Sequence, residues 1–209
     1  MKIIVPCCGR SSRYPNMPPK WLLPASDGIP MIVKSVEGLE FAIEDLVVVV
    51  LEEHEQAYSV RQGLADFFGA PVRVVTLPEP TRSQSETVAR ALEVLELNEP
   101  FIVKDSDNAF TLTALEQPVN YVSVASLNDF DVVNPRNKSF VTVDNDNIIQ
   151  SIHEKKVVSD LFSVGGYFFQ DPARFLEVFR RLDSDPNSRL SEIYLSDIIA
   201  FMVMQGDPF

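Results

Sequence analysis

Apolar stretches that read as strands alternate with amphipathic stretches that read as helices through the N-terminal part of the chain. Residues 46–51 form an unbroken run of leucine and valine, which is typical of a parallel strand buried on both faces. Residues 86–97 carry apolar side chains at helical spacing. The other predicted elements here are strands at 2–8, 72–76, 101–103 and 121–125 and helices at 31–39 and 54–68.

From Asn137 onward the pattern changes. Residues 139–144 and 148–152 predict a hairpin with a polar turn, and residues 161–169 predict another strand. Helices are predicted from Asp171 or Pro172 to about 182, and over 191–204. The whole order predicts one α/β domain over 1–209, a Rossmann-like three-layer sandwich with a mixed, mostly parallel sheet.

Charge narrows the choice of partners. The net charge of −12 argues against general attraction to nucleic acid or to an anionic membrane surface. An anionic substrate therefore needs a local basic patch. The candidates for it are Arg10, Arg13, Lys20, Arg82, Lys104, Lys155 and Lys156.

Cysteine and histidine usage offers no redox or zinc site. Cys7 and Cys8 are neighbours, which rarely bridge each other, and we expect both to be buried packing residues. His54 and His153 are too isolated to suggest zinc. The N-terminus lacks a signal-peptide pattern and the longest apolar run is too short to span a bilayer, so we expect a cytoplasmic protein.

A loop of small residues follows the first predicted strand. It contains Cys8, Gly9, Ser11 and Ser12 together with Arg10 and Arg13, and Lys20 comes after it. Small residues let backbone N–H groups approach a phosphate, and the cations add charge-assisted contacts. The loop is therefore either a triphosphate cradle or an ordinary polar surface turn.

Two carboxylates follow the strand predicted at 101–103. Asp105 and Asp107 are two positions apart, so both face the same side if the backbone stays extended. Carboxylates at the carboxyl edge of a sheet suit Mg²⁺ held jointly with substrate phosphates. The alternative is a polar loop with capping residues.

The N-terminal motifs resemble a known family. Gly9–Arg13, then Lys20-Trp21-Leu22-Leu23-Pro24, then Pro30-Met31-Ile32 resemble the signature of the sugar-phosphate nucleotidyltransferases, which include glucose-1-phosphate thymidylyltransferases and related pyrophosphorylases. Their usual form is Gly-x-Gly-Thr/Ser-Arg, a spacer, Pro-Lys and Leu-Leu-Pro. Ser11 replaces the second glycine and the spacer is shorter. The resemblance implies the GT-A-like nucleotidyltransferase fold.

Two further segments continue the resemblance. Asp107-Asn108-Ala109-Phe110 resembles the family's metal-binding Asp-Asn-x-Phe, which implies Mg²⁺ at Asp107. Asp105 is a second candidate ligand because of its place at the strand end. Residues 81–88 look like a Gly-Gln-x-Glu-Thr segment, which implies base contacts by Gln84 and by Arg82. Ordinary N-capping by Ser85 would also explain that segment, and both readings can hold.

The later motifs appear in family order. Glu154-Lys155 resembles the pair that contacts the phosphorylated acceptor, although a surface ion pair is the default for such a dipeptide. The segment from Val164 to Phe169 resembles Thr-Gly-x-Tyr-Phe-Tyr, where Gly165 would let substrate approach the backbone or would mark a bulge. The segment 192–197 resembles Glu-x-x-x-Thr-Asp, and we read Ser196 and Asp197 as structural.

One family segment is missing. Members usually continue with Trp-x-Asp-x-Gly-Thr, whose aspartate completes the metal site, and this sequence ends at Phe209 before it. The chain is therefore cut short, or another residue supplies the ligand, or the domain is impaired.

The reading as a whole is a Mg²⁺-dependent nucleotidyltransferase that joins an NTP to a small phosphorylated acceptor and releases pyrophosphate. Arg13, Lys20 and Lys155 are the expected catalytic residues. Cys8, Gly9, Arg10, Ser11, Ser12, Gln84, Glu154 and Gly165 are expected to bind the substrates. A GT-A-type glycosyltransferase using Asp105 and Asp107, or an inactive nucleotide-binding domain, are the alternatives. The base, the acceptor and the oligomeric state stay open.

Overall fold

The computed structural model describes residues 1–9, 17–129, 134–185 and 192–209. The strands within them are β1 (Lys2–Cys7), β2 (Leu46–Leu51), β3 (Arg73–Leu77), β4 (Phe101–Lys104), β5 (Tyr121–Ser126), β6 (Phe140–Val143), β7 (Ile149–His153) and β8 (Leu161–Phe169). The helices are α1 (Met31–Val36), α2 (Glu52–Tyr58), α3 (Val60–Phe68), α4 (Gln84–Leu95), α5 (Pro172–Asp183) and α6 (Leu195–Met204), with short 3₁₀ turns at Lys20–Leu22, Ile43–Asp45 and Pro135–Asn137. None of the helices in these ranges is long and apolar enough to cross a membrane.

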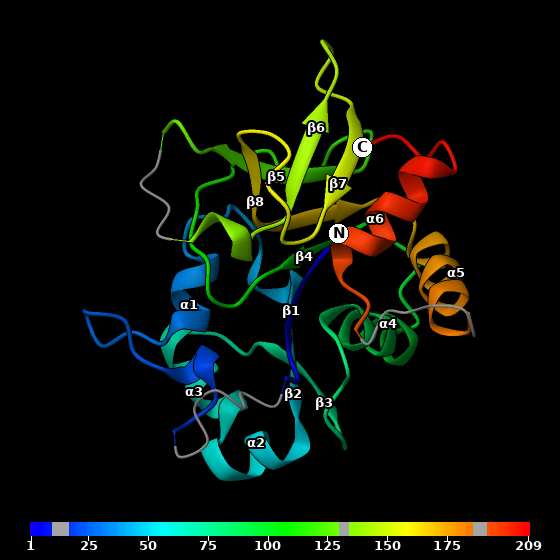
Figure 1. The fold of residues 1–209 in the computed structure, drawn as a ribbon. Coiled ribbons are helices and arrows are strands. Elements are labelled where there is room, and N and C mark those ends of the chain that lie inside the picture. The colour runs from blue at the N-terminus through cyan, green and yellow to red at the C-terminus, as the bar shows by residue number, and fades with distance from the viewer. Residues whose placement is uncertain (10–16, 130–133, 186–191) are drawn as a thin grey trace.

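The strands form one mixed sheet in the order β3-β2-β1-β4-β8-β6-β7, with β5 also paired to β8 (Figure 1). Strands β3, β2, β1 and β4 are parallel to one another. β8 runs antiparallel to β4, β5 and β6, and β6 runs antiparallel to β7. This sheet confirms the predicted fold class, and the predicted hairpin is β6-β7.

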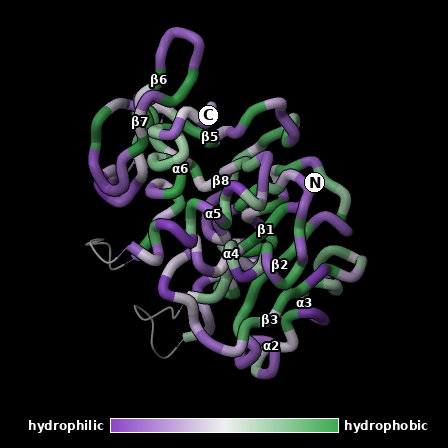
Figure 2. Tube along the Cα trace, turned by 90° about the vertical axis from the view of Figure 1, so that its right-hand side faces the viewer, coloured by the Kyte–Doolittle hydropathy of each residue, from purple (hydrophilic) through white to green (hydrophobic). Residues whose placement is uncertain are grey.

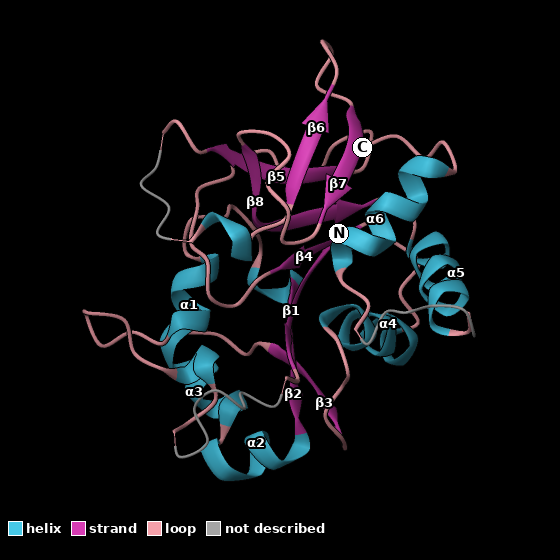
Figure 3. Cartoon of the chain, in the orientation of Figure 1, coloured by secondary structure: helices cyan, strands magenta, loops and turns pink. Residues whose placement is uncertain are grey.

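Helices cover both faces of the parallel strands (Figure 3). In β2, Val48 and Val50 belong to the core cluster that contains residues of α1 and α3, whereas Val47 and Val49 belong to the cluster that contains residues of α4, α5 and α6. Because neighbouring strand residues point to opposite faces, an all-apolar strand can serve both clusters. Figure 2 shows the result as apolar strands β1 to β3 in the interior and a hydrophilic tip on the β6-β7 hairpin.

Three predicted helix details are wrong. The helix predicted at 54–68 is two helices, because Ser59 takes a left-handed conformation (φ 49°) between α2 and α3. Ser83, not Ser85, caps α4, since its hydroxyl accepts a hydrogen bond from the Glu86 N–H at 3.1 Å. The last helix begins at Leu195, and the predicted start at Ser191 lies outside the described residues.

The cysteines pack as predicted. Cys7 and Cys8 are both buried and neither forms a disulfide. Burial raises the pKa of the Cys8 thiol to about 12, so this thiol is neutral at physiological pH.

Candidate active site

A polar cavity of about 210 Å³ lies beyond the carboxyl end of β4. Its walls come from the start of α4, the loop after β4, the segment before β6, the end of β7, β8 and the start of α6. The lining residues are Gln84, Asp105, Asp107, Asn108, Asn137, Lys138, Ser139, Glu154, Ser163, Tyr167, Tyr194, Leu195 and Ser196. The fold therefore gathers predicted site residues that are far apart in the sequence.

Asp105 connects α4 to the loop after β4. One carboxylate oxygen accepts a hydrogen bond from Gln84 Nε2 at 2.6 Å, and the other accepts one from Asn108 Nδ2 at 3.3 Å. Burial raises the pKa of Asp105, the hydrogen bond from Gln84 opposes this shift, and the nearby Asp107 adds to it. Because both amides give their NH₂ groups to Asp105, their carbonyl oxygens remain as acceptors for a ligand.

Gly165 makes room for Asp105. Its φ is +86°, and a Cβ atom at this position would lie 2.4 Å from Oδ2 of Asp105. The Asp105 N–H also donates to the Gly165 carbonyl at 2.8 Å. The close approach that we expected for a substrate is thus made by the Asp105 side chain, and Gly165 supports the site from behind it.

Asp107, which lines the cavity, forms an ion pair with Lys20. Lys20 begins a short 3₁₀ turn, and the next residue, Trp21, is buried and anchors that turn. Asp107 is more exposed than Asp105, because β4 ends at Lys104 and the backbone turns. The condition that the backbone stays extended is therefore not met, although both aspartates line the same cavity.

Glu154 lies on the opposite side of the cavity, directly after β7. Its Oε2 atom accepts hydrogen bonds from the hydroxyls of Ser139 and Ser196, the second at 2.9 Å. Its Oε1 atom lies 3.8 Å from Lys155 Nζ. Two hydroxyl donors therefore fix the orientation of a carboxylate that also lines the cavity.

Lys155 leaves the hairpin in a left-handed conformation (φ 54°) and reaches Tyr194. Its Nζ donates to the Tyr194 hydroxyl at 2.7 Å and lies 4.3 Å from the centre of the tyrosine ring. This hydrogen bond raises the pKa of Lys155, so the side chain is a stable cation at neutral pH. The structure thus places a half-exposed lysine beside the Glu154 end of the cavity.

Lys104 does not belong to a surface basic patch, contrary to the prediction. Its side chain is fully buried at the end of β4. Burial lowers the pKa of Lys104 to about 8, and the charges of Asp105 and Asp107 oppose this shift.

The predicted phosphate loop is only partly described. Cys8 is buried, its carbonyl accepts a hydrogen bond from the Thr81 N–H at 3.4 Å, and Gly9 is exposed. Arg10, Ser11, Ser12 and Arg13 lie outside the described residues. The described part places the start of this loop beside the segment that leads into α4.

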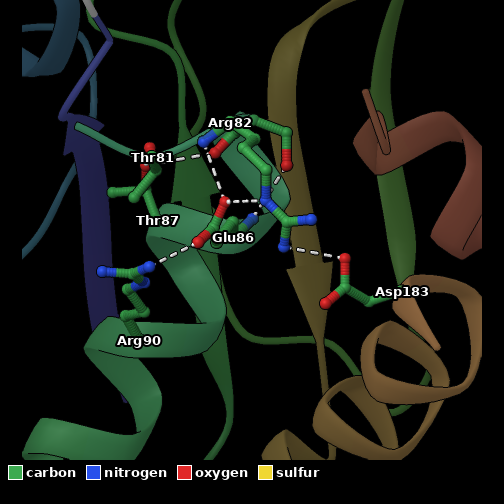
Figure 4. A network of polar contacts seen from close by, with 7 residues as sticks. Thr81, Arg82, Glu86, Thr87, Arg90 and Asp183 are labelled. Atoms are coloured by element: carbon green, nitrogen blue, oxygen red, sulfur yellow. Dashed lines mark hydrogen bonds and ion pairs between the residues drawn. The ribbon is translucent and has the colours of Figure 1, made fainter. Parts of the chain in front are cut away.

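That segment is held by a buried glutamate (Figure 4). Glu86 accepts hydrogen bonds from the backbone and the side chain of Arg82, at 2.8 and 3.0 Å, and from Arg90 at 2.6 Å. Arg82 also pairs with Asp183 at 2.8 Å. Burial raises the pKa of Glu86, but the arginine hydrogen bonds outweigh it and the net shift is downward. Arg82 therefore has two carboxylate partners inside the protein, one of them buried.

The carboxylates fit one kind of metal site. Within the described ranges, no group of three or more histidine, cysteine, aspartate and glutamate side chains is arranged to hold a metal ion. Mg²⁺ is commonly bound through one or two carboxylates and completes its coordination with water and substrate phosphates. Asp105 and Asp107 suit that arrangement, and they do not suit a site made of protein ligands alone.

Several lining residues were missed or misread in the sequence. Asp197 is structural as predicted, because its carboxylate accepts the Tyr194 N–H at 2.8 Å. Its neighbour Ser196, also read as structural, donates to Glu154 and lines the cavity. Ser139 and Lys138 carried no motif that would have marked them.

A larger cavity of about 1060 Å³ lies on the other face of β8. Val164 and Phe162 line it, whereas Ser163 and Tyr167 line the polar cavity, as expected for alternate strand residues. The two cavities share only Asn108 and Lys138 among their described lining residues. Its lining is mainly apolar, and neither Asp105 nor Asp107 reaches it.

Comparison with known proteins places this geometry in context. A family model described as MobA-like NTP transferase domain matches residues 3–124. This range contains β1 to β4, α4 and both aspartates. No curated protein sequence matches the chain.

Solved structures share the fold over almost the whole chain. The nucleoside-diphosphate-sugar pyrophosphorylase from Vibrio cholerae RC9 has a TM-score of 0.79 and 23% identity, and the match covers 99% of this chain and 89% of that one. The inositol-1-phosphate CTP transferase from T. maritima has a TM-score of 0.72 and 18% identity, with 99% and 82% covered. A UDP-glucose pyrophosphorylase complexed with UDP-glucose has a TM-score of 0.70 and 14% identity, with 98% and 87% covered.

Proposed function

The chain belongs to the family of MobA-like NTP transferase domains, and from this premise we propose that it transfers a nucleotidyl group from an NTP to a sugar phosphate or a similarly small phosphorylated acceptor. The observation that carries the proposal is a polar cavity at the end of β4 that Asp107 and Glu154 line, each of them paired with a lysine, Lys20 and Lys155. In α/β sheets, ligands bind beyond the carboxyl ends of the strands. A phosphate-binding cation is thus available on each side of the cavity.

The lining favours an acceptor rich in hydroxyl groups. The Glu154 carboxylate, which the hydroxyls of Ser139 and Ser196 orient, is a hydrogen-bond acceptor that matches hydroxyl donors of a ligand. The names of the similar structures refer to a nucleoside-diphosphate sugar, inositol 1-phosphate and UDP-glucose. We therefore favour a sugar or polyol phosphate over phosphocholine, which lacks hydroxyl donors.

The reaction needs little covalent work from the protein. An oxygen of the acceptor phosphate attacks the α-phosphorus, the bond from that phosphorus to the bridging oxygen breaks, and pyrophosphate leaves. Positioning and charge neutralisation supply most of the acceleration in such a transfer. Lys20 stabilises charge at the α-phosphate, Lys155 binds the acceptor phosphate, and Arg13 with the loop of residues 8–12 binds the triphosphate. No general base is required, because the acceptor phosphate is already ionised.

The carboxylates of Asp105 and Asp107 fit Mg²⁺ as the cofactor. Asp107 would hold the ion, with Asp105 beside it, and the bound ion supplies charge neutralisation at the phosphates. Asp105 keeps Gln84 and Asn108 oriented in either case.

We treat residues 1–209 as one nucleotidyltransferase domain, since β8 pairs with β4 from the N-terminal part and with β5 and β6 from the later part. Its cytoplasmic location stays a prediction.

A pyrophosphate-release screen tests the proposal. Each of the four common NTPs is offered with Mg²⁺ and a matched set of acceptors: glucose 1-phosphate, inositol 1-phosphate, glucose and phosphocholine. We expect release to require both an NTP and a hydroxylated acceptor phosphate, and to fall to background with glucose. Absence of release with every pair would contradict the proposal, and NTP-independent consumption of a nucleotide sugar would point to glycosyl transfer instead.

A further inference from the structure

The proposed chemistry leaves Lys104 without a role, although this lysine lies directly beneath the loop that carries both aspartates. Its side chain is 0% exposed, which is unusual for a lysine. Burying an ammonium group costs free energy unless hydrogen bonds and nearby charges compensate for it. The contacts of Lys104 therefore indicate what it does.

Those contacts join the two ends of the aspartate turn. Nζ of Lys104 donates to the backbone carbonyl of Asp105 at 2.7 Å and to that of Asn108 at 2.5 Å. It also lies 4.8 Å from the centre of the Phe110 ring, over its face. The chain from residue 105 to residue 110 thus wraps around one ammonium group, with Asp107 between the two bonded carbonyls.

Two glycines let the turn close over the lysine. Gly166 is the β8 partner of Lys104, and a Cβ atom there would lie 2.6 Å from Cζ of Phe110. A Cβ atom on Gly38 would lie 2.3 Å from the Phe110 carbonyl oxygen. Phe110 is therefore seated against backbone on two sides, which fixes the far end of the turn above Lys104.

We infer that Lys104 is a positioning residue, whose ammonium holds the Asp105–Asn108 turn in the shape that presents both carboxylates to the cavity. The expected effect of Lys104 on activity rests on the proposed function, but its expected effect on the shape of the turn does not. A fixed cation beneath the turn also offsets the repulsion between two neighbouring carboxylates. Lys104 touches no substrate in this arrangement and acts through Asp105 and Asp107.

Lys104→Met tests the inference, because methionine fills a similar volume and has neither charge nor donor. Lys2→Met is the matched control: Lys2 also donates to a backbone carbonyl, that of Glu44, and to Asp45, but at the other end of the sheet. Hydrogen–deuterium exchange of the amides at 105–110 is compared with that of β1 in the metal-free proteins. We expect faster exchange of the turn by about 10-fold or more in Lys104→Met alone.

Steady-state kinetics give the second measurement. We expect Lys104→Met to lower kcat by about 10- to 100-fold while the acceptor KM changes by less than about threefold, since the acceptor side is untouched. Lys104→Gln, which keeps a donor, replaces the methionine variant if that one does not fold. Unchanged turn exchange, an equal effect of Lys2→Met, or an unchanged kcat would overturn the inference. A wild-type protein that releases no pyrophosphate would refute the proposed function, while the exchange comparison would still test Lys104.

Discussion

The proposed nucleotide side and the proposed acceptor side of the cavity are held by different contacts. On the proposed acceptor side, the neutral hydroxyls of Ser139 and Ser196 orient one oxygen of Glu154, and the other oxygen lies 3.8 Å from Lys155. On the nucleotide side, charged groups pair with each other, as Lys20 does with Asp107. The orientation of Glu154 is therefore fixed mainly by neutral donors, whereas on the proposed nucleotide side a substrate with Mg²⁺ would have to replace the close ion pair of Lys20 and Asp107.

Replacing Asp107 should reduce metal-dependent turnover more than any other substitution on the proposed nucleotide side. We expect Asp107→Asn to lower metal-dependent turnover by about 100- to 1000-fold, the range found for losing one group that stabilises developing charge. Pyrophosphate release across a Mg²⁺ titration measures it, with thermal melting as the check on folding. Asp160→Asn is the control, since that carboxylate accepts from Ser126 and Asn128 outside the polar cavity. Near-normal turnover of Asp107→Asn at limiting Mg²⁺ would show that the metal assignment is wrong.

The two lysines should separate the two sides kinetically. An interaction that strengthens in the transition state lowers kcat when it is lost. We expect Lys20→Ala to lower kcat and Lys155→Ala to raise the acceptor KM, each by roughly 10- to 150-fold. Kinetics with both substrates varied, and calorimetry of NTP binding, distinguish the effects. If Lys155→Ala abolished NTP binding and left the acceptor KM unchanged, the division into two sides would fail.

Glu154→Gln should have a smaller effect, confined to the acceptor side. The amide keeps the shape but loses the negative charge and replaces one of the two accepting oxygens by a donor, so we expect the acceptor KM to rise about 10-fold with NTP affinity unchanged. Acceptor titrations at saturating NTP measure it. Glu177→Gln is the control, because Glu177 is exposed and pairs only with Arg174 among its described contacts. An equal loss of NTP affinity would contradict the comparison.

Glu86→Gln should affect stability, by about 1–2 kcal/mol, because it weakens buried hydrogen bonds to a charged acceptor. The pKa of Glu86 is lower in the folded protein than its usual 4.5, so its stabilisation is present above that value and is lost as pH falls through the folded pKa. The gap between wild type and variant should therefore close in acid. Urea unfolding at neutral and acid pH measures it.

Glu93→Gln, in the exposed pair with Arg180, is the control and should cost less than about 1 kcal/mol. A pH-independent gap for Glu86→Gln would show that the charge of this carboxylate does not contribute to stability.

The sequence predicted what depends on local pattern. The apolar run of β2 and the polar turn of the β6-β7 hairpin are both visible in a short stretch of sequence, and both elements formed as expected. The left-handed Ser59 had no such signal, because neither glycine nor proline marks the break between α2 and α3.

The candidate site was predicted where it lies in motifs and missed where it depends on contacts between distant segments. Ser196 meets Glu154 across 42 positions, and no local pattern encodes that hydrogen bond. Lys104 looked like one more surface cation, because its burial depends on the turn that closes over it. Gly165 was singled out correctly as a special position, but the group that needs its space is Asp105.

The place of β8 in the sheet also sets an order of events during synthesis. The side chains of β4 are apolar up to Ile102 and Val103. One edge of this strand stays unpaired until β8 pairs with it. β8 follows β5, β6 and β7 in the chain, so until it is made the β4 edge of the parallel strands presents unpaired backbone N–H and C=O groups. Folding of the N-terminal part is therefore coupled to completion of the later part, and slow delivery of β8 would favour aggregation over completion of the sheet.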